Sequence, residues 1–323
     1  MKFCSYLVRD INFEADAIQP CCNTRALRRL PRFPFSGGRR LDMGEYRKHL
    51  EQTLEAIQEP GGMCAGCDQL VDLDVPEGKR LALDPQFATV SFNMHRHLCN
   101  CRCVYCSLWE KPSKAYEVLP ALKSLASQHS FRPDCFFSWG GGEPTILREF
   151  ESASRWIFEQ GYLQYVHSNA LRFSPVLAEL LRSGRGGLNV SLDSGSPEIY
   201  RAVKGVDGFA KVVANIGAYA EAAKSPDAVE LKYIVFEKNN SRDEVDRFFD
   251  LCRSAGVRRV QLSLNFLEVN AGALSEATLD AAAWFLYRAV ALGMQCAPFF
   301  LSDALVESLK KRAEALALAE DQS

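Results

Sequence analysis

The sequence predicts an α/β protein with a parallel sheet, and two observations support this. From about residue 87 onward, short apolar segments rich in β-branched and aromatic residues alternate with helical segments. One helical segment carries apolar residues at i, i+3, i+4 and i+7, which is the period of an amphipathic helix: Phe209, Val212, Val213 and Ile216. Since parallel strands need crossover connections, serial β-then-α units indicate a parallel sheet. The pattern fits either an open sheet or a partial barrel, and both place the active site at the carboxyl ends of the strands.

Six segments are strand candidates, and several are almost continuously apolar, as strands buried on both faces are. They lie at residues 87–94, 134–140, 165–170, 188–193, 229–236 and 260–266. A seventh candidate, at 296–300, lies within a tail that is otherwise rich in Ala and Leu and predicted to be helical. We therefore expect the sheet domain over residues 81–268 and a helical extension over residues 269–323.

Residues 1–80 differ from this pattern. They contain several prolines, two glycine pairs and one clear helix, predicted at residues 42–58. Five of the twelve cysteines also lie in this region: Cys4, Cys21, Cys22, Cys64 and Cys67. This composition predicts a small cysteine-rich module that is stabilised by a bound metal more than by an apolar core.

Composition and charge limit the classes of protein and partner. A hydrophobic content of 47% and a charged content of 24% are typical of a globular protein, and a net charge of −2 argues against binding to nucleic acid or to a membrane surface. No apolar run approaches the roughly 20 residues of a membrane span, and the first residues lack the apolar core of a signal peptide. We therefore expect a cytoplasmic protein, in which cysteines serve as metal ligands or reactive thiols more than as disulfides.

The segment HLCNCRCVYCSLW (97–109) crowds four cysteines together. Cys99, Cys103 and Cys106 have the spacing C-x3-C-x2-C, with Cys101 between the first two, and the segment follows the first predicted strand. Three thiolates can hold three irons of a 4Fe–4S cluster and leave the fourth iron open to a non-protein ligand. Spacing alone leaves a zinc site as an alternative, with Cys101, His95 or His97 as its fourth ligand.

The pattern C-x3-C-x-Tyr-C resembles the signature of the radical SAM superfamily, and WGGGEPT (139–145) at the end of the next strand resembles that family's GGEP motif. The resemblance covers about residues 87–266. It implies a partial (β/α)6 TIM-like barrel, a 4Fe–4S cluster on the catalytic residues Cys99, Cys103 and Cys106, and S-adenosylmethionine as the ligand of the open iron.

The resemblance also implies a set of cofactor-binding residues. Tyr105 belongs to the cysteine signature. In the GGEP-like turn, Gly141 and Gly142 let backbone groups approach a ligand without a Cβ in the way. Glu143 supplies an acceptor for the ammonium group of the methionine moiety.

Two further segments extend this set. In VSLDSGSPEIYRAVKG (190–205), the resemblance implies that Ser191 and Asp193 face the ribose and carboxylate of the cofactor. Arg201, or Lys204 in its place, would pair with the carboxylate, since Arg and carboxylate can pair through two parallel hydrogen bonds. HSNA (167–170) resembles the family's Thr-Asn-Gly element and adds Ser168, but Ala replaces the glycine.

The N-terminal segments FEADAIQPCC (13–22), LDMGEYRKHLEQ (41–52) and MCAGC (63–67) resemble the auxiliary-cluster module called SPASM, or its shorter twitch form. In the family this module usually follows the barrel, whereas here it precedes it. The resemblance implies a second 4Fe–4S cluster on Cys64 and Cys67, completed by Cys21 or Cys22 and by Cys4. Adjacent Cys21 and Cys22 cannot easily both bind one metal. A zinc site of four cysteines remains the alternative.

The resemblance implies an enzyme that reductively cleaves S-adenosylmethionine to a 5′-deoxyadenosyl radical, which then abstracts hydrogen from a substrate. A flavodoxin- or ferredoxin-like protein would donate the electron. We expect oxidative modification of a peptide or protein side chain. The alternatives are a small polar or nucleotide-linked metabolite and, third, RNA. An iron–sulfur or zinc sensor is the alternative without catalysis, but a sensor needs no glycine turn for this cofactor.

Overall fold

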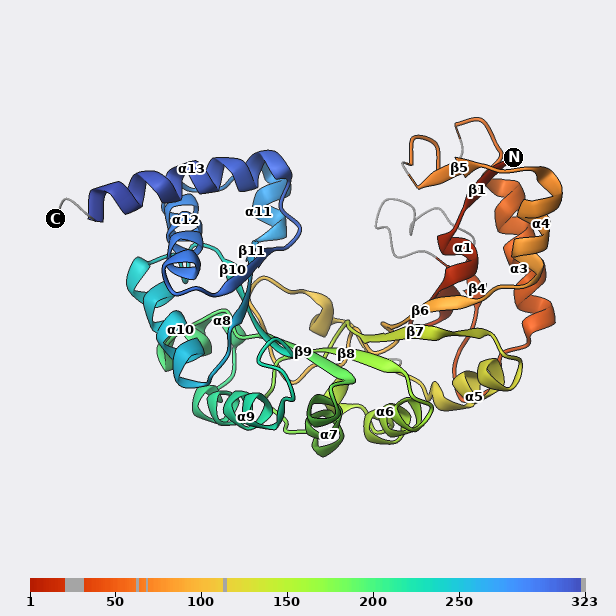
Figure 1. Ribbon diagram of the computed structural model, residues 1–323, viewed down its shortest axis with the longest axis horizontal. Helices are drawn as coiled ribbons and strands as arrows, with labels where there is room; N and C mark the ends of the chain where they lie inside the picture. Colours follow the sequence, from red (N-terminus) through yellow and green to blue (C-terminus); the bar gives the residue numbers. More distant parts are fainter. Residues whose placement is uncertain (21–31, 62–63, 68, 113–114, 321–323) are drawn as a thin grey trace. The chain divides into compact units, whose positions relative to one another are not determined.

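A computed structural model describes residues 1–20, 32–61, 64–67, 69–112 and 115–320 (Figure 1). It shows the predicted α/β fold with mostly parallel strands. The chain divides into two compact units, which are described separately: unit 1 comprises residues 1–98 and 111–165, and unit 2 comprises residues 99–110 and 166–323. Within the described ranges, every helix is too short or too polar to cross a membrane.

The strands follow the sequence prediction closely from residue 87 onward. In chain order they are β1 (Lys2–Cys4), β2 (Asp10–Phe13), β3 (Ala17–Gln19), β4 (Phe33–Pro34), β5 (Leu70–Asp72), β6 (Phe87–Phe92), β7 (Phe131–Trp139), β8 (Leu163–Ser168), β9 (Gly186–Ser191), β10 (Val229–Val235), β11 (Arg259–Leu264) and β12 (Gln295–Pro298). β6 to β11 correspond to the six candidates, and β12 confirms the seventh.

Helices separate the strands and form the end of the chain. They are α1 (Tyr6–Arg9), α3 (Met43–Ala56), α4 (Val75–Leu83), α5 (Leu119–Ser127), α6 (Phe150–Glu159), α7 (Pro175–Ser183), α8 (Pro197–Lys204), α9 (Phe209–Ala222), α10 (Arg242–Ser254), α11 (Phe266–Ala271), α12 (Glu276–Ala291) and α13 (Asp303–Glu320). Two short 3-10 turns, η1 (Leu108–Glu110) and η2 (Pro144–Ile146), lie in loops. The helix predicted at 42–58 is α3, whose cap Asp42 accepts hydrogen bonds from the backbone N–H groups of Gly44 and Glu45.

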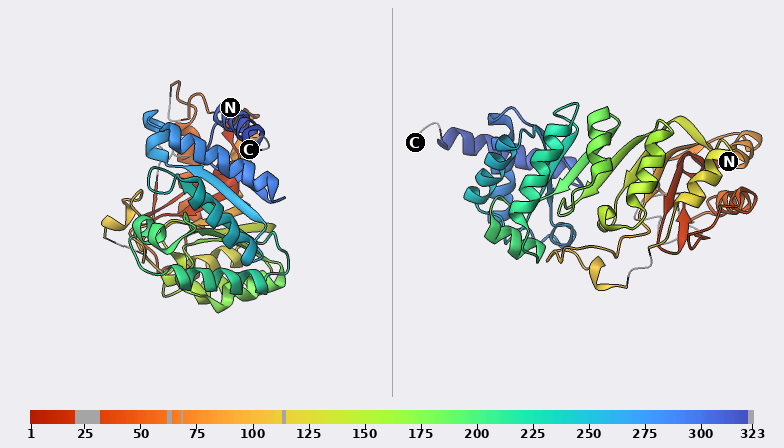
Figure 2. Two further views of the ribbon diagram at one scale, coloured as in Figure 1. Left: turned by 90° about the vertical axis from the view of Figure 1, so that its left-hand side faces the viewer. Right: turned by 90° about the horizontal axis from the view of Figure 1, so that it is seen from below.

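Unit 2 contains four parallel strands in the order β9-β10-β11-β12. Leu231 of β10 lies opposite Val190 of β9 and Val260 of β11, and all three side chains are fully buried. The helices of unit 2 cover this apolar face (Figure 2). For example, the ring of Tyr233 lies 4.9 Å from that of Phe248 on α10. Burial under the helices explains why these strands are apolar enough to be recognised in the sequence.

In unit 1, β6 pairs in parallel with β7, and β2 pairs in parallel with the other edge of β6. The sequence analysis predicted no strand at residues 10–19. Ile11 and Phe13 of β2 are fully buried, and the Phe13 ring stacks on Phe92 of β6 at 5.9 Å. Part of the N-terminal region is therefore stabilised by packing against the main sheet. The boundary near residue 80 stays a prediction.

Candidate active site

The cysteine loop, residues 99–106, contains neither helix nor strand and belongs to unit 2. Cys99, Cys103 and Cys106 are partly exposed, whereas Cys101 is buried. The backbone N–H of Cys101 contacts Cys99 Sγ at 3.4 Å, and that of Cys106 donates to the Cys103 carbonyl at 3.0 Å. The turn therefore presents three accessible thiols from one short segment, which suits a cluster with one open position.

The pKa values of two of these thiols are shifted in different directions. A hydrogen bond from the Cys101 thiol lowers the pKa of Cys103 to about 6; burial opposes this shift, and the Lys204 ammonium adds to it. Burial raises the pKa of Cys106. Since the thiolate is the metal-binding form, Cys103 is better prepared than Cys106 to bind a metal. In this geometry, no three Cys, His, Asp or Glu side chains among the described residues form a complete metal site.

The end of α8 holds the cysteine loop. The backbone N–H of Arg102 donates to the Lys204 carbonyl at 2.8 Å, and that of Val104 donates to the Val203 carbonyl at 3.0 Å. These carbonyls have no partner within the helix because they lie in its last turn. Gly205 follows with φ +66°, and a Cβ there would lie 2.7 Å from the Arg102 carbonyl oxygen. The close approach of loop and helix therefore requires glycine at this position.

A buried charged network lies beneath the loop. Lys204 forms an ion pair with Asp193 and donates to the Tyr105 hydroxyl at 3.0 Å. The Tyr105 hydroxyl donates to Asp193 Oδ2 at 2.5 Å, and the backbone N–H of Ile234 donates to Oδ1 at 2.8 Å. The Lys204 and Asp193 side chains are 1% and 0% exposed. Burial works to lower the pKa of Lys204, but attraction to Asp193 and Cys103 outweighs it, so the pKa is raised and Lys204 stays charged.

The other cofactor residues predicted in unit 2 are only partly brought together. Ser191 ends β9 and is partly exposed. Ser168 ends β8, is buried, and its Oγ accepts from the Ala170 N–H at 2.9 Å. Arg201 is exposed on α8, and the ion pair with Asp193 is formed by Lys204. The structure therefore does not bring Arg201 to Asp193.

The structure also explains the family's glycine at position 170. Ala170 is fully buried and has φ +56°, in the left-handed region that favours glycine. The preceding Asn169 is tied to this turn, because its Oδ1 accepts from the Leu171 N–H at 3.0 Å. Its amide group also donates to Asn100 at 2.6 Å and contacts Cys99 Sγ at 3.8 Å. Asn169 therefore contacts the cysteine loop directly, although the sequence resemblance there is weak.

The GGEP-like turn lies in unit 1. Gly141 has φ +84°, and a Cβ on Gly142 would lie 2.1 Å from the Leu98 carbonyl oxygen and 2.5 Å from that of His95. The backbone N–H of Glu143 donates to the same Leu98 oxygen at 2.8 Å. The sequence analysis expected glycine here for the approach of a ligand. The structure shows that Gly142 also permits close packing against the residues that precede Cys99.

Glu143 is buried at the start of η2. Its carboxylate accepts from the Thr145 backbone N–H at 3.1 Å and from the Thr145 hydroxyl at 2.7 Å. Both hydrogen bonds end on Oε1. They fix the orientation of the carboxylate and do not involve Oε2. A carboxylate held in this way is chemically suited to accept from an ammonium group.

A row of polar side chains on β9, β10 and β11 of unit 2 was not predicted from the sequence. Asn189 donates to Glu230 Oε2 at 2.7 Å, and Gln261 donates to the same oxygen at 3.3 Å. Lys232 lies two residues beyond Glu230, opposite Ser191, with its ammonium 4.8 Å from the centre of the Phe299 ring. Burial lowers the pKa of Lys232. The signal in the sequence was the alternation of polar and apolar residues along these strands, as in Asn189 and Ser191 of β9 and Glu230 and Lys232 of β10.

Three of the five N-terminal cysteines lie together in unit 1. Cys4 and Cys64 are buried in an apolar cluster with Phe3, and Cys67 packs against this cluster. The backbone N–H of Cys67 donates to the Cys64 carbonyl at 3.0 Å. Burial raises the pKa of Cys4, and the neighbouring Cys67 and Cys64 add to the shift. Since this cluster contains apolar side chains, packing contributes to the fold of the region.

Cys21 and Cys22, the other two predicted ligands of this module, lie outside the described residues. The auxiliary metal site therefore stays a prediction.

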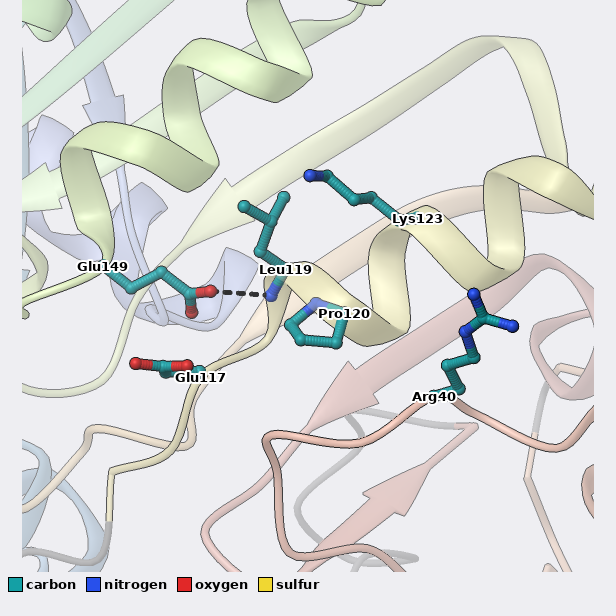
Figure 3. A pocket seen from close by; sticks show the side chains of 6 residues that line it. All are labelled: Arg40, Glu117, Leu119, Pro120, Lys123 and Glu149. Atoms are coloured by element: carbon teal, nitrogen blue, oxygen red, sulfur yellow. Dashed lines mark hydrogen bonds between the residues drawn. The ribbon is translucent and has the colours of Figure 1, made fainter.

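A cavity of about 340 Å³ opens at the start of α5 in unit 1 (Figure 3). It is lined by Arg40, Glu117, Leu119, Pro120, Lys123 and Glu149. The Glu149 carboxylate accepts from the backbone N–H groups of Val118 and Leu119, the latter at 2.9 Å. Glu149 therefore satisfies the donors at the start of this helix, which is a structural role. None of the residues lining this cavity belongs to the predicted site.

Comparisons with known proteins agree with the residues just described. Residues 94–243 match the family model described as the radical SAM superfamily. A probable GTP 3′,8-cyclase of Saccharolobus islandicus is 27% identical over 171 residues, which are 51% of this chain and 53% of that protein. A probable GTP 3′,8-cyclase of Sulfurisphaera tokodaii is 25% identical over 51% of this chain and 52% of its own length. The chain spans about half the length of the curated relatives it matches.

Two solved structures share the fold. Streptococcus suis SuiB bound to the precursor peptide SuiA has a TM-score of 0.50 at 12% identity, over 80% of this chain and 62% of that one. Native anSMEcpe with bound AdoMet has a TM-score of 0.50 at 17% identity, over 66% and 64%. At these identities the likeness shows the fold alone.

The fold and the family match define the class of the protein: an α/β enzyme of the partial-barrel type. The match over residues 94–243 supports an enzyme of the radical SAM superfamily. The matched family implies a 4Fe–4S cluster and S-adenosylmethionine, and the three accessible thiols of the cysteine loop fit such a cluster in donor type and number.

Proposed function

We propose that Cys99, Cys103 and Cys106 hold a 4Fe–4S cluster and that the chain catalyses hydrogen abstraction from its substrate. The observation that carries this proposal is the presentation of three accessible thiols on one loop that the end of α8 holds in place. When bound, the cluster and S-adenosylmethionine supply a 5′-deoxyadenosyl radical by reductive cleavage. The barrel binds and orients the reactants and excludes water from them.

Each part of the chain has a role in this proposal. Gly141, Gly142 and Glu143 bind the methionine end of the cofactor, and Ser191 and Ser168 contact its nucleoside part. Tyr105 and Asp193 hold the loop through their mutual hydrogen bond, which is a different role from the ribose contact that the resemblance implies. A flavodoxin- or ferredoxin-like protein supplies the electron.

For the substrate, we propose a peptide or protein side chain that undergoes oxidative modification. The N-terminal cysteines support this proposal, because auxiliary clusters in the family accept electrons from substrate radicals. Cys64, Cys67 and Cys4, with Cys21 or Cys22, would hold this second cluster, and the proximity of the first three supports it.

A second candidate is a nucleotide-linked metabolite. The relatives named as probable GTP 3′,8-cyclases favour it. The chain itself offers Lys232, which no acidic residue of the described chain contacts within ion-pair distance, on the strand face that carries Ser191. The ammonium group of a lysine is a usual partner of a phosphate.

One experiment tests the reaction and separates the substrates. Anaerobically reconstituted protein is reduced and incubated with S-adenosylmethionine, and 5′-deoxyadenosine is quantified with no substrate, with GTP or with cell-derived peptides. Formation of 5′-deoxyadenosine supports the reaction. If only peptides stimulate the formation of 5′-deoxyadenosine and themselves change in mass, the first candidate is supported. Consumption of GTP supports the second candidate. If the iron-loaded, reduced protein forms no 5′-deoxyadenosine under any condition, the proposed function is wrong.

A further inference from the structure

The Lys204–Asp193 pair is the most deeply buried pair of opposite charges in contact with the cysteine loop. Both side chains are essentially inaccessible, and both belong to unit 2 together with the loop. Burying two charges is costly unless each is paired and hydrogen-bonded. Here both conditions are met. Tyr105 is hydrogen-bonded to both Lys204 and Asp193, and the backbone N–H of Ile234 donates to the other oxygen of the Asp193 carboxylate.

The acceptors of Asp193 are already in use. Oδ1 accepts from Ile234, Oδ2 accepts from Tyr105 and Lys204, and the Asp193 carbonyl accepts from the Asn239 amide at 2.9 Å. Its backbone has φ +59°, a conformation that costs free energy in a residue other than glycine. A fully buried carboxylate with hydrogen bonds to both of its oxygens is poorly placed to contact a ribose. It is well placed to position Lys204 and Tyr105.

We infer that the Lys204–Asp193 pair positions the cysteine loop and sets the fixed charge next to the cluster bound by Cys103, and thereby tunes the reduction potential of that cluster. The inference rests on the proposed function, because it requires the cluster on Cys99, Cys103 and Cys106. Lys204 has two roles. Its backbone carbonyl accepts a hydrogen bond from the Arg102 N–H of the loop, and its ammonium group provides the positive charge near the cluster.

The direction of the electrostatic effect follows from Coulomb's law in a medium of low dielectric constant. Reduction adds one negative charge to the cluster. The positive charge of Lys204 stabilises the reduced form and raises the potential, and the negative charge of Asp193 partly cancels this.

Three variants separate the two charges. Asp193→Asn keeps the shape and leaves the cation uncompensated, so the potential should rise. Lys204→Met keeps most of the volume and leaves the anion, so the potential should fall. In Asp193→Asn/Lys204→Met both charges are gone, and the potential should return close to that of the wild type. Lys211→Met, which removes an exposed positive charge from α9, is the matched control and should not shift it.

The readout is an anaerobic redox titration of the reconstituted cluster followed by electron paramagnetic resonance, without S-adenosylmethionine. We expect each single variant to change the ratio of reduced to oxidised cluster at a fixed potential by about tenfold, which is about 59 mV for a one-electron couple. Equal potentials in all variants, or shifts of the same sign in both single variants, would overturn the electrostatic role. If Asp193→Asn binds S-adenosylmethionine more weakly while its reduction potential is unchanged, Asp193 contacts the ribose of the cofactor and does not tune the cluster.

A second readout does not depend on iron. Hydrogen exchange at the Arg102 and Val104 amides in the iron-free chain should be faster in Lys204→Met than in the wild type or in Lys211→Met. Unchanged exchange would overturn the positioning role. Failure of the proposed function is visible separately, since wild-type protein would then hold no cluster or form no 5′-deoxyadenosine.

Discussion

The Tyr105 hydroxyl lies 2.5 Å from Asp193 Oδ2, although the two residues are 88 positions apart in the chain. Tyr105 lies immediately before Cys106, and Asp193 follows the end of β9. The contact therefore fixes the last part of the cysteine loop to the sheet of unit 2. A loop that carries metal ligands benefits from such a partner, because ligand orientation depends on the groups behind the ligands.

The first prediction concerns the cluster thiols. The Cys99→Ala/Cys103→Ala/Cys106→Ala variant should lose the barrel cluster, and its formation of 5′-deoxyadenosine should fall to background in a reduced anaerobic assay. Cys101→Ala is the matched control from the same loop. It should keep the iron, because the open position of the cluster belongs to the cofactor and not to a fourth thiol. Formation of 5′-deoxyadenosine by the triple variant would show that these three cysteines do not hold the catalytic cluster.

The second prediction concerns Gly142. Gly142→Ala should destabilise the protein by about 1–3 kcal/mol, since the added methyl group collides with backbone oxygens and overpacking costs this much. Gly142→Val should cost more and should also reduce both iron content and binding of S-adenosylmethionine, because the displaced Leu98 is joined to Cys99. Thermal unfolding, iron analysis and calorimetry are the measurements.

Gly217→Ala on α9 is the control for this prediction, because nothing lies within 4 Å of the added methyl group. It should stabilise the helix by up to about 1 kcal/mol. Wild-type stability and cofactor binding in Gly142→Val would show that the turn does not need this glycine.

The third prediction separates the roles of the N-terminal cysteines. If Cys64 and Cys67 hold a 4Fe–4S cluster, the wild type should contain roughly eight irons per chain and Cys64→Ala/Cys67→Ala roughly four. The variant should still form 5′-deoxyadenosine but little oxidised product. If the site binds zinc, only one zinc should disappear. Cys135→Ala, on β7 of the same unit, should change neither metal. Wild-type metal content and product in the double variant would exclude both roles.

The fourth prediction concerns pH and His95, whose ring nitrogens are buried without a hydrogen-bond partner among the described residues. Burial, with the nearby Arg96, lowers the pKa of His95 from 6.5 to about 3. Below pH 6.5, His95 therefore binds a proton in the unfolded chain but stays neutral in the folded chain. The stability contributed by neutral His95 is lost as the pH falls, at up to about 1.4 kcal/mol per pH unit.

The measurement is the free energy of unfolding between pH 7.5 and pH 5, compared with His95→Met. The comparison is necessary because burial raises the pKa of Asp10 to about 6, which acts in the opposite direction. The wild type should lose stability relative to His95→Met as the pH falls. Parallel curves for the two proteins would show that His95 is not buried in its neutral form.

The sequence predicted the strands of the main sheet well because burial on both faces makes them apolar. β2 and β3 were missed because they are only three or four residues long and therefore too short to show a clear period of apolar residues. The cysteine signature and glycine turn were visible because their chemistry requires particular residues at fixed spacing. The charged pair was not visible as a pair, since its geometry depends on tertiary contacts between α8, β9 and the loop.

The choice between Arg201 and Lys204 shows what could have been predicted. Tyr200, Val203 and Lys204 are spaced i, i+3 and i+4 along α8, and all three are buried. The period of the apolar residues therefore indicates the buried face, and Lys204 lies on it while Arg201 does not. The helical period could therefore have predicted that Lys204 is buried, whereas the choice of Arg201 or Lys204 as partner of the cofactor carboxylate stays a prediction.

The hydrogen bonds from the cysteine loop to the end of α8 have a consequence for protein engineering. The loop at residues 99–106 and the helix end at residues 203–205 form one interlocking piece, because the loop amides need those two carbonyls and the contact needs Gly205. A chimera that transplants the loop alone from another member of the family would place foreign side chains against this helix end. Transplanting the loop together with residues 193–205 would carry along the two carbonyls, Gly205 and the Asp193 partner of Tyr105, so these two segments should be exchanged together.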